Sequence, residues 1–321
     1  MMKTIGILTS GGDAPGMNAA IRAVVRAGCE KGIKVLGINR GYNGLMNDDM
    51  YEMNLRTVSD IIQRGGTILY SARSPEFKTE EGLQKAIETC KKRGIDGLVV
   101  IGGDGSFRGA RDLSLRGLPC VAIPGTIDND IGCCDYTIGY DTALNTVMQM
   151  VDRIRDTTES HDRCAVVEVM GRGAGYIALN AGIACGATSI LIPEIDFDFE
   201  RDVIERMKRT QKTGKVHFVI LVSEAIGGVD EMAKRIQAET GVESRATVLG
   251  HVQRGGSPTA KDRIVASQMG YKAVELLEQN IGNRVVAMQK EKILDFDIYE
   301  ALGMKSGIDL HLYKIANEIS I

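Results

Sequence analysis

Three apolar segments of this chain each end in a cluster of glycine and aspartate, and this pattern constrains the fold most strongly. Residues 3–9, 97–101 and 119–124 have the composition of buried β-strands. The clusters that follow them occupy residues 10–16, 102–106 and 125–130. Glycine permits tight turns and a close approach to the backbone, and a helix that follows presents its positive end. We therefore expect strands that end in ligand-binding turns.

The alternation of strand and helix patterns continues along the chain. Further strands are expected at residues 34–39, 165–170, 189–193 and 217–223. Helical patterns occupy residues 17–30, 80–93, 141–155, 176–185, 202–213, 230–239 and 262–278. This order predicts an α/β protein whose parallel sheets are covered by helices on both faces. In such folds ligands bind at the carboxyl ends of the strands, which is where the clusters fall.

Length and composition narrow the class of protein further. The 321 residues suggest two domains, and the absence of a linker indicates that these domains share crossing segments. A net charge of −3 argues against nucleic-acid binding, and no run is apolar enough to cross a membrane. The first nine residues lack a signal-peptide layout, and the seven cysteines are scattered without a CxxC motif. A reduced, cytoplasmic protein fits these features best.

Each cluster has a functional and a purely structural interpretation. The first is neither a Walker A loop nor GxGxxG, so it is either a phosphate loop or an ordinary tight turn. In the second, Asp104 suits a magnesium–polyphosphate group or caps a helix. In the third, Asp128 and Asp130 are two residues apart, so an extended loop would point both the same way. That pair suggests a base and a partner that organises water or metal, although an Asx turn is the alternative.

Several basic residues could bind phosphate groups or could simply be solvated charges. A dispersed group suits a phosphorylated substrate, because guanidinium groups bind phosphate bidentately. This group comprises Arg73, Arg163, Arg172, Arg245 and Arg254, with His251 near the last of them in sequence. Arg22 and Arg26 are an i, i+4 pair, which forms either a solvated helix face or a second phosphate site.

Taken together, the clusters resemble the ATP-dependent bacterial 6-phosphofructokinase family. The motifs that recur in the same order are TSGGDAPGMNAAIRAVVR (residues 9–26), RGGT…SAR (64–73), KKRGIDGLVVIGGDGS (91–106), PGTIDNDI (124–131), RIRDT (153–157), VEVMGR (167–172) and ETGVESRATVLGHVQRGGSP (239–258). They span nearly the whole chain. The resemblance implies transfer of the γ-phosphate of MgATP to the 1-hydroxyl of fructose 6-phosphate, in glycolysis.

The resemblance also implies a role for individual residues. Asp128 resembles the base for the 1-hydroxyl proton, and Asp104 resembles the magnesium ligand. The implied nucleotide site comprises Gly12, Tyr42, Arg73, Ser74, Gly103, Asp104, Gly105 and Ser106, with Tyr42 near the adenine. The implied sugar-phosphate contacts are Thr126, Asp128, Arg163, Met170, Gly171, Arg172, Glu224, Arg245, His251 and Arg254. Arg73 and Arg172 would neutralise charge on the transferring group, while Thr126 and Asp130 help to position substrate and metal.

The family architecture is two αβα-sandwich domains with Rossmann-like sheets and crossing segments. It places a nucleotide-binding domain at residues 1–138 plus 252–305, and a sugar-phosphate-binding domain at 139–251 plus 306–321. Because Arg163 and Arg245 come from the neighbouring subunit in the family, the resemblance implies a homotetramer.

Three other functions have less support from the residues. Relatives that use pyrophosphate carry Asp where Gly105 stands and Lys where Gly125 stands, and those side chains would crowd the α-phosphate of ATP. The two glycines are expected to leave that space open, which favours ATP. A nicotinamide-dependent oxidoreductase lacks support, because there is no GxGxxG followed by a ribose-binding acid. A non-catalytic nucleotide sensor would be expected to lose Asp128 or Arg172, and both are present.

The chain departs from the family at the effector site, which binds ADP or phosphoenolpyruvate. The basic pattern is matched by Arg22, Arg26, Arg155 and Lys215. Thr188 replaces the usual glutamate, Leu55 replaces an arginine (Arg56 is displaced by one), and Thr213 replaces a second basic residue. We expect a phosphate-binding effector site that responds weakly or not at all to ADP, because an effector acts only through its differential affinity for two states.

Overall fold

The computed structural model describes residues 2–320 and divides into two compact units. Unit 1 comprises residues 1–127, 131–142 and 254–306, and unit 2 comprises 128–130, 143–253 and 307–321. Each unit is therefore assembled from separate stretches of chain. Compared with the domain limits expected above, unit 1 extends to residue 142, and the short segment 128–130 groups with unit 2.

Unit 1 is built on a seven-stranded sheet. Its order is β11(Lys292–Asp297)-β10(Arg284–Gln289)-β5(Cys120–Pro124)-β4(Gly97–Gly102)-β1(Thr4–Ser10)-β2(Lys34–Ile38)-β3(Met50–Met53). The five inner strands are parallel, while β3 and β11 pair antiparallel at the edges. β1, β4 and β5 are almost entirely buried, which explains why their sequences are continuous apolar runs.

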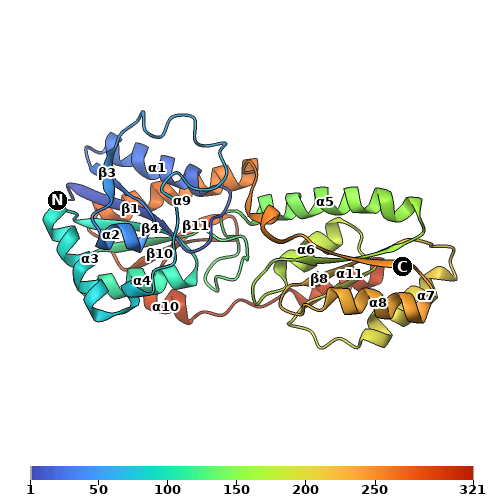
Figure 1. The fold of residues 1–321 in the computed structure, drawn as a ribbon. Coiled ribbons are helices and arrows are strands. Elements are labelled where there is room, and N and C mark those ends of the chain that lie inside the picture. Colours follow the sequence, from blue (N-terminus) through green and yellow to red (C-terminus); the bar gives the residue numbers. More distant parts are fainter. Residues whose placement is uncertain (1, 321) are drawn as a thin grey trace. The chain divides into compact units, whose positions relative to one another are not determined.

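Helices cover both faces of this sheet (Figure 1). α1(Met17–Glu30) and α9(Ala260–Glu278) pack against each other on one face. α3(Glu80–Arg93), α4(Asp104–Ser114) and the short α2(Tyr42–Met46) and α10(Ile298–Gly303) lie on the other. α1 buries Ile21, Val24 and Val25, as its 3.6-residue period predicts. Gly270 of α9 allows close packing on α1, because a Cβ there would lie 2.8 Å from the Ala20 carbonyl oxygen.

Unit 2 contains a four-stranded parallel sheet in the order β7(Ser189–Leu191)-β8(Phe218–Ser223)-β6(Cys164–Val169)-β9(Ser244–Val248). Its helices are α5(Tyr140–Ser160), α6(Tyr176–Ala184), α7(Arg206–Gln211), α8(Val229–Thr240) and α11(Leu310–Ile319). A buried cluster that includes Val166, Phe218 and Ile220 joins this sheet to α8 and to residues 203–207. The helix predicted over 202–213 begins instead as a π-helical turn, Glu200–Glu205. The two α/β domains of the prediction are thus present.

The remaining predicted elements end within a few residues of the observed ones, but four strands and four helices had no prediction: β3, β9, β10 and β11, and α2, α4, α10 and α11. Of these strands, β10 and β11 form a hairpin whose two-residue turn is Lys290–Glu291. Both turn residues have positive φ, as a type I′ turn requires, but neither is the glycine or asparagine that usually signals one. The edge strand β9 and the helices α4 and α11 complete the secondary structure, with short 3₁₀ turns at Glu76–Lys78 and Gly250–Arg254.

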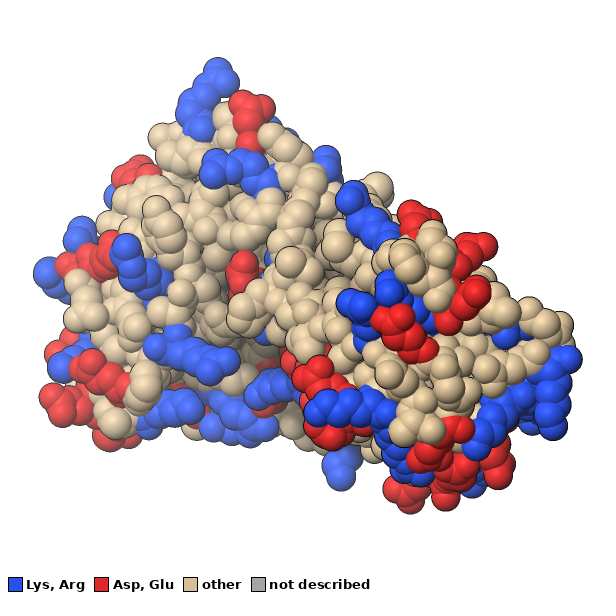
Figure 2. Space-filling view, turned by 45° about the vertical axis from the view of Figure 1, so that its right-hand side comes forward, with Lys and Arg blue, Asp and Glu red and all other residues tan. Residues whose placement is uncertain are grey.

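Acidic and basic side chains are interspersed over the face displayed in Figure 2. Within residues 2–320, no helix has both the length and the apolar character needed to cross a membrane. All seven cysteines are free thiols, and burial raises the pKa of Cys90, Cys120 and Cys164 to about 12.

Candidate active site

The register of the unit 1 sheet brings the three glycine–aspartate clusters together. Ser10 at the end of β1 is paired with Gly102 at the end of β4, and Gly102 is paired with Pro124 at the end of β5. The Gly125 N–H donates to the Gly102 carbonyl (3.0 Å), and the Ser106 hydroxyl donates to the Ser10 carbonyl (3.1 Å). The carboxyl edge of these strands therefore carries all three clusters side by side.

The start of α4 has the features of an anion site. Its N-cap is Gly103, which supplies no side chain to the first-turn N–H groups. The Ser106 and Phe107 N–H groups donate to the Gly103 carbonyl (2.9 and 3.1 Å), so a ligand would meet the N–H groups of Asp104 and Gly105 and the positive end of the helix. A Cβ at Gly105 would meet nothing within 4 Å, and at Gly103 only the Thr126 Cβ at 4.0 Å. The open space expected at Gly105 is present. Gly125 differs, because its Cβ would lie 2.9 Å from Ile101 Cγ2, so the expectation of open space there is wrong.

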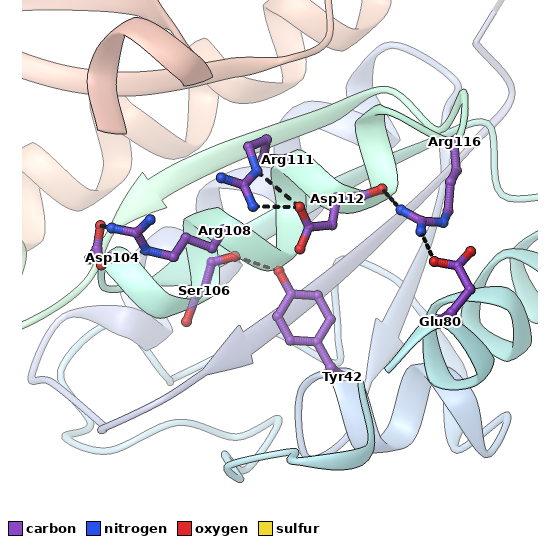
Figure 3. A network of polar contacts seen from close by, with 8 residues as sticks. All are labelled: Tyr42, Glu80, Asp104, Ser106, Arg108, Arg111, Asp112 and Arg116. Atoms are coloured by element: carbon purple, nitrogen blue, oxygen red, sulfur yellow. Dashed lines mark hydrogen bonds and ion pairs between the residues drawn. The ribbon is translucent and has the colours of Figure 1, made fainter. Parts of the chain in front are cut away.

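Asp104 lies in the first turn of α4 and forms an i, i+4 ion pair with Arg108 (Figure 3). The Arg108 Nε lies 3.1 Å from Asp104 Oδ2, and both side chains are more than a third exposed. Farther along α4, Asp112 accepts from Arg111, and just beyond the end of this helix Arg116 pairs with Glu80 of α3 (Figure 3). No group of three potential metal-ligating side chains occurs in the described part of the chain. A single exposed carboxylate beside open helix donors suits a cation carried mainly by phosphate oxygens.

Tyr42 is buried beneath the start of α4. Its ring is only 4% exposed and stacks on Phe77 with centroids 3.9 Å apart. Its hydroxyl donates to the Ser106 carbonyl at 2.6 Å, as Figure 3 also shows, and burial raises its pKa well above 10.0. A Cβ at Gly109 would lie 2.7 Å from this ring. The ring therefore packs against the first turn of α4, and its expected place near an adenine remains a prediction.

The segment that carries Arg73 and Ser74 lies next to the first glycine cluster. The Ser71 hydroxyl donates to the Gly11 carbonyl (2.6 Å), and the Asn43 amide donates to the Arg73 carbonyl (3.5 Å). Ser74 accepts from the Phe77 N–H at 3.3 Å, and the Arg73 side chain is exposed. These contacts bring both residues to the same edge of unit 1 as the glycine clusters.

Arg254 belongs to unit 1 and also reaches the first glycine cluster. Its Nη1 lies 3.4 Å from the Asp13 carbonyl, and a Cβ at Gly12 would meet the guanidinium at 1.9 Å. Gly12 is itself exposed, so glycine at this position leaves room for Arg254 beside the loop. Its expected role as a sugar-phosphate contact remains a prediction.

The turn after β5 carries Asp128 and Asp130, but it is not extended. Asn129 between them has a φ of +53°, a left-handed conformation that asparagine tolerates better than most residues. The two-residue alternation of an extended chain therefore does not apply, and that part of the prediction is wrong. Asp128 is buried, with 7% exposed. Asp130 is partly exposed, and its Oδ2 lies 3.8 Å from Arg172 Nη1 within unit 2.

Arg172 is held by its backbone at the end of β6. It has a φ of +59°, and its N–H and that of Gly171 both donate to Glu224 Oε1, at 2.5 and 3.1 Å. The Met170 N–H donates to the side chain of Gln253 (3.1 Å), which is fully buried. Gln253 lies within the motif at residues 239–258, but no function was predicted for it from the sequence. Its buried amide is the link between the residue 170–172 loop and the Gly250–Arg254 turn, which carries the exposed His251.

Arg163 and Arg245 meet at one carboxylate. Arg163 Nε lies 3.0 Å from Glu243, and Arg245 Nη2 lies 2.8 Å from the same side chain. Parallel pairing of β6 with β9 brings these arginines together from distant parts of the sequence. Two guanidinium groups at one carboxylate form a positive region on unit 2.

The basic residues expected at the effector site occur as neighbouring pairs in each unit. In unit 1, burial and then the charge of Arg26 lower the pKa of Arg22. In unit 2, burial and then the charge of Arg155 lower the pKa of Lys215. Thr188 is 1% exposed, and its hydroxyl has no hydrogen-bond partner. Leu55, Arg56 and Thr213 are exposed.

The fold and these sites define an α/β protein with glycine-rich turns at the carboxyl edge of a parallel sheet and clustered arginines on a second parallel-sheet unit. The chain belongs to the phosphofructokinase family, whose model matches residues 4–277.

Curated relatives cover the chain almost completely. The ATP-dependent 6-phosphofructokinase of Clostridium botulinum (strain Hall) is 56% identical over 319 residues, which is 99% of this chain and 100% of the relative. The enzyme of the same name from Clostridium tetani is 57% identical over the same lengths. Phosphofructokinase from Saccharomyces cerevisiae has a similar structure, with a TM-score of 0.89 and 34% identity over 99% of this chain. The chain spans 48% of that yeast chain. A pyrophosphate-dependent phosphofructokinase from Marinobacter aquaeolei shares the fold, with a TM-score of 0.85 at 22% identity over 97% of this chain and 86% of its own.

Proposed function

We propose that this chain is an ATP-dependent 6-phosphofructokinase that forms fructose 1,6-bisphosphate and ADP from fructose 6-phosphate and ATP. The observation that carries the proposal is the alignment of Ser10, Gly102 and Pro124 across the sheet, which gathers the three clusters at one edge. The extent of identity to enzymes of this name supports the same function. It argues against both a nicotinamide-dependent oxidoreductase and a non-catalytic sensor.

The nucleotide phosphates would lie at the first glycine cluster and at the start of α4. The donors available there are the first two backbone N–H groups of the helix, together with its positive end. Gly12, Gly103 and Gly105 would allow the phosphates to approach the backbone, while Ser106 ties β1 to α4. Arg73 and Ser74 are held near this edge and would contribute contacts to the nucleotide.

Asp128 would act as the base of the reaction. As the 1-hydroxyl oxygen attacks the γ-phosphorus, its proton would pass to the Asp128 carboxylate, and the bond to the ADP oxygen would break. Burial of Asp128 places the carboxylate in surroundings of low dielectric, where its interaction with a nearby hydroxyl proton is strong. Thr126 and Asp130 flank this base in the same turn.

Positive side chains would balance the phosphate charges. Arg172, held by Glu224 through its backbone and by Asp130 through its side chain, would stabilise charge on the transferring group. Glu224 would also accept a hydrogen bond from a sugar hydroxyl, as the family resemblance implies. Met170, Gly171, His251 and Arg254 complete the proposed sugar-phosphate contacts, together with Arg163 and Arg245, which the family resemblance assigns to the neighbouring subunit of a homotetramer.

A magnesium ion would be held by Asp104 together with the nucleotide phosphates. When bound, it would neutralise the negative charge of the β- and γ-phosphates. The exposed carboxylate fits such a shared ion, whereas an ion held by protein side chains alone would need more ligands. Arg108 pairs with this carboxylate and would have to release it to the ion. We place the enzyme in the cytoplasm, where glycolysis supplies its substrates.

The experiment that tests the function is a coupled assay of fructose 6-phosphate phosphorylation, run in parallel with ATP and with pyrophosphate. The expected result is rapid turnover with MgATP and little with magnesium pyrophosphate, because the space at Gly105 accommodates the extra phosphate and nucleoside. Equal or better turnover with pyrophosphate would overturn the choice of donor. Absence of turnover with either donor would overturn the function.

A further inference from the structure

Asp262 is a buried carboxylate to which the proposed mechanism assigns no role. It lies in the first turn of α9 and is 0% exposed. Its oxygens accept from the Tyr136 hydroxyl (2.6 Å), the Gly139 N–H (2.7 Å), the Thr142 N–H (2.9 Å) and the Thr142 hydroxyl (2.5 Å). Among residues 2–320, only Asp128 and Asp262 are buried carboxylates. Four donors directed at one group are the environment of an ionised carboxylate.

The segment held by Asp262, residues 136–142, lies directly against the turn that leads to Asp128. The Ile138 N–H donates to the Pro124 carbonyl (3.0 Å), and the Thr137 hydroxyl donates to the Thr126 carbonyl (2.6 Å). Residue 138 also forms an isolated β-bridge with Gly125. These backbone contacts set the path of the chain immediately before the base.

The same segment packs tightly on the first glycine cluster. Gly139 has a φ of +102°, and a Cβ there would lie 2.7 Å from the Ala14 Cβ and 3.3 Å from Ile127 Cγ2. A Cβ at Gly16 would lie 2.7 Å from Ile138 Cγ2. One short segment therefore contacts both the proposed phosphate loop and the proposed base-bearing turn. A shift of residues 136–142 would therefore displace both turns, because there is no room for even a Cβ at Gly139 or Gly16.

Burial of Asp262 disfavours its ionised form. Burial raises its pKa above the ordinary value, although the hydrogen bonds from Thr142, Tyr136 and Gly139 act in the opposite direction. A raised pKa means that the ionised form is less favourable in the folded protein than in the unfolded chain. The charge is therefore retained in spite of its burial, as is expected of groups around functional sites.

We propose that Asp262 is a positioning residue for the phosphoryl-transfer reaction. Through residues 136–142 it holds the glycine loop of residues 10–16 and the turn of residues 124–127 in fixed relation to each other. The inference rests on the proposed function, because it assigns the two loops to donor phosphates and base. Small displacements of reacting groups reduce turnover steeply, while contacts that bind the ground state are affected less.

The first test is Asp262→Asn, which keeps the shape of the side chain but removes its charge and turns an amide N–H₂ toward a donor. We expect kcat to fall by about tenfold or more, with KM for both substrates within about threefold. The matched control is Asp297→Asn, which alters a helix-capping carboxylate in the same unit that accepts from the Tyr299 and Glu300 N–H groups. The control should retain wild-type kcat. Assays are run below the unfolding midpoint of each variant.

A second pair of variants decides the matter if Asp262→Asn does not fold. Thr142→Val removes the hydroxyl that joins Asp262 to the Thr259 N–H, whereas Thr142→Ser keeps it. We expect the valine variant to lose several-fold in kcat and the serine variant to recover it. Wild-type kcat in Asp262→Asn or, if that variant does not fold, in Thr142→Val would overturn the inference, as would raised KM values with unchanged kcat. An inactive wild-type protein would overturn the proposed function instead.

Discussion

Replacing Gly105 by aspartate should abolish efficient use of ATP while leaving the fold intact. The side chain would start in open space, since a Cβ at this position meets nothing within 4 Å. An acidic residue in the first turn of α4 is compatible with the helix, because it faces the positive end of the helix dipole. Any loss of activity must then come from the ligand and not from misfolding.

The size of the effect follows from electrostatics. A carboxylate about 5 Å from one phosphate charge, at an effective dielectric constant of about 20, costs roughly 3 kcal/mol. This corresponds to a decrease in kcat/KM for MgATP on the order of a hundredfold. Steric crowding of the α-phosphate would add to it. The loss should be specific for the donor, so KM for fructose 6-phosphate should change little.

The assay is the coupled measurement of fructose 6-phosphate phosphorylation with MgATP as the varied substrate. Gly105→Asn and Gly105→Ala are matched controls, because the first keeps the size of the new side chain without its charge and the second adds only a methyl group. We expect near wild-type activity for alanine and an intermediate loss for asparagine. If Gly105→Asp retained kcat/KM for MgATP within threefold of wild type, the assignment of the α4 start to the ATP phosphates would be wrong.

Three further outcomes are expected. Asp128→Ser should lower kcat by about 10²-fold or more with near-normal substrate binding, because a positioned base typically contributes 10²–10⁴; near-normal turnover would remove Asp128 from the role of base. Asp48→Asn should lower the free energy of unfolding at pH 7 by up to about 1 kcal/mol. The Arg93 hydrogen bond lowers the pKa of Asp48, so this stabilisation is complete above about pH 4 and is lost as the pH falls through the lowered pKa. The deficit of the variant in denaturant titrations should therefore shrink toward acid, and a deficit that is independent of pH would contradict the ion-pair explanation. Millimolar MgADP should activate weakly or not at all at subsaturating fructose 6-phosphate, because buried Thr188 provides no carboxylate for a nucleotide-bound metal; several-fold activation that Arg155→Ala abolishes would refute this.

The sequence predicted the regular parts of this fold because burial leaves a clear pattern. β4 is buried along its whole length and reads as a continuous apolar run, and the clusters lie together because parallel strands end at one edge. The β10–β11 hairpin was not predicted, because its turn residues Lys290 and Glu291 are not the glycine or asparagine that usually signals such a turn. Edge strand β3 was not predicted, because it is short and largely exposed and so has no apolar pattern.

The candidate site was predicted less completely, because its details depend on contacts between distant residues. Asp262 meets Tyr136 and Thr142 across more than a hundred residues, and no local pattern signals such a contact. The stacking of Tyr42 on Phe77 is equally invisible in sequence. The left-handed conformation of Asn129 overturned the expected alternation in the base-bearing turn, although asparagine is a residue that tolerates it.

The most direct measurement of the central claim is phosphorus NMR of the purified protein with fructose 6-phosphate and MgATP. We predict a new phosphate-ester resonance at C1 of the sugar, which grows in equal amount with ADP while the 6-phosphate resonance persists. The same sample prepared with Asp128→Ser should form this product about a hundredfold more slowly. Release of inorganic phosphate without the C1 ester, or phosphorylation at another position, would contradict the account.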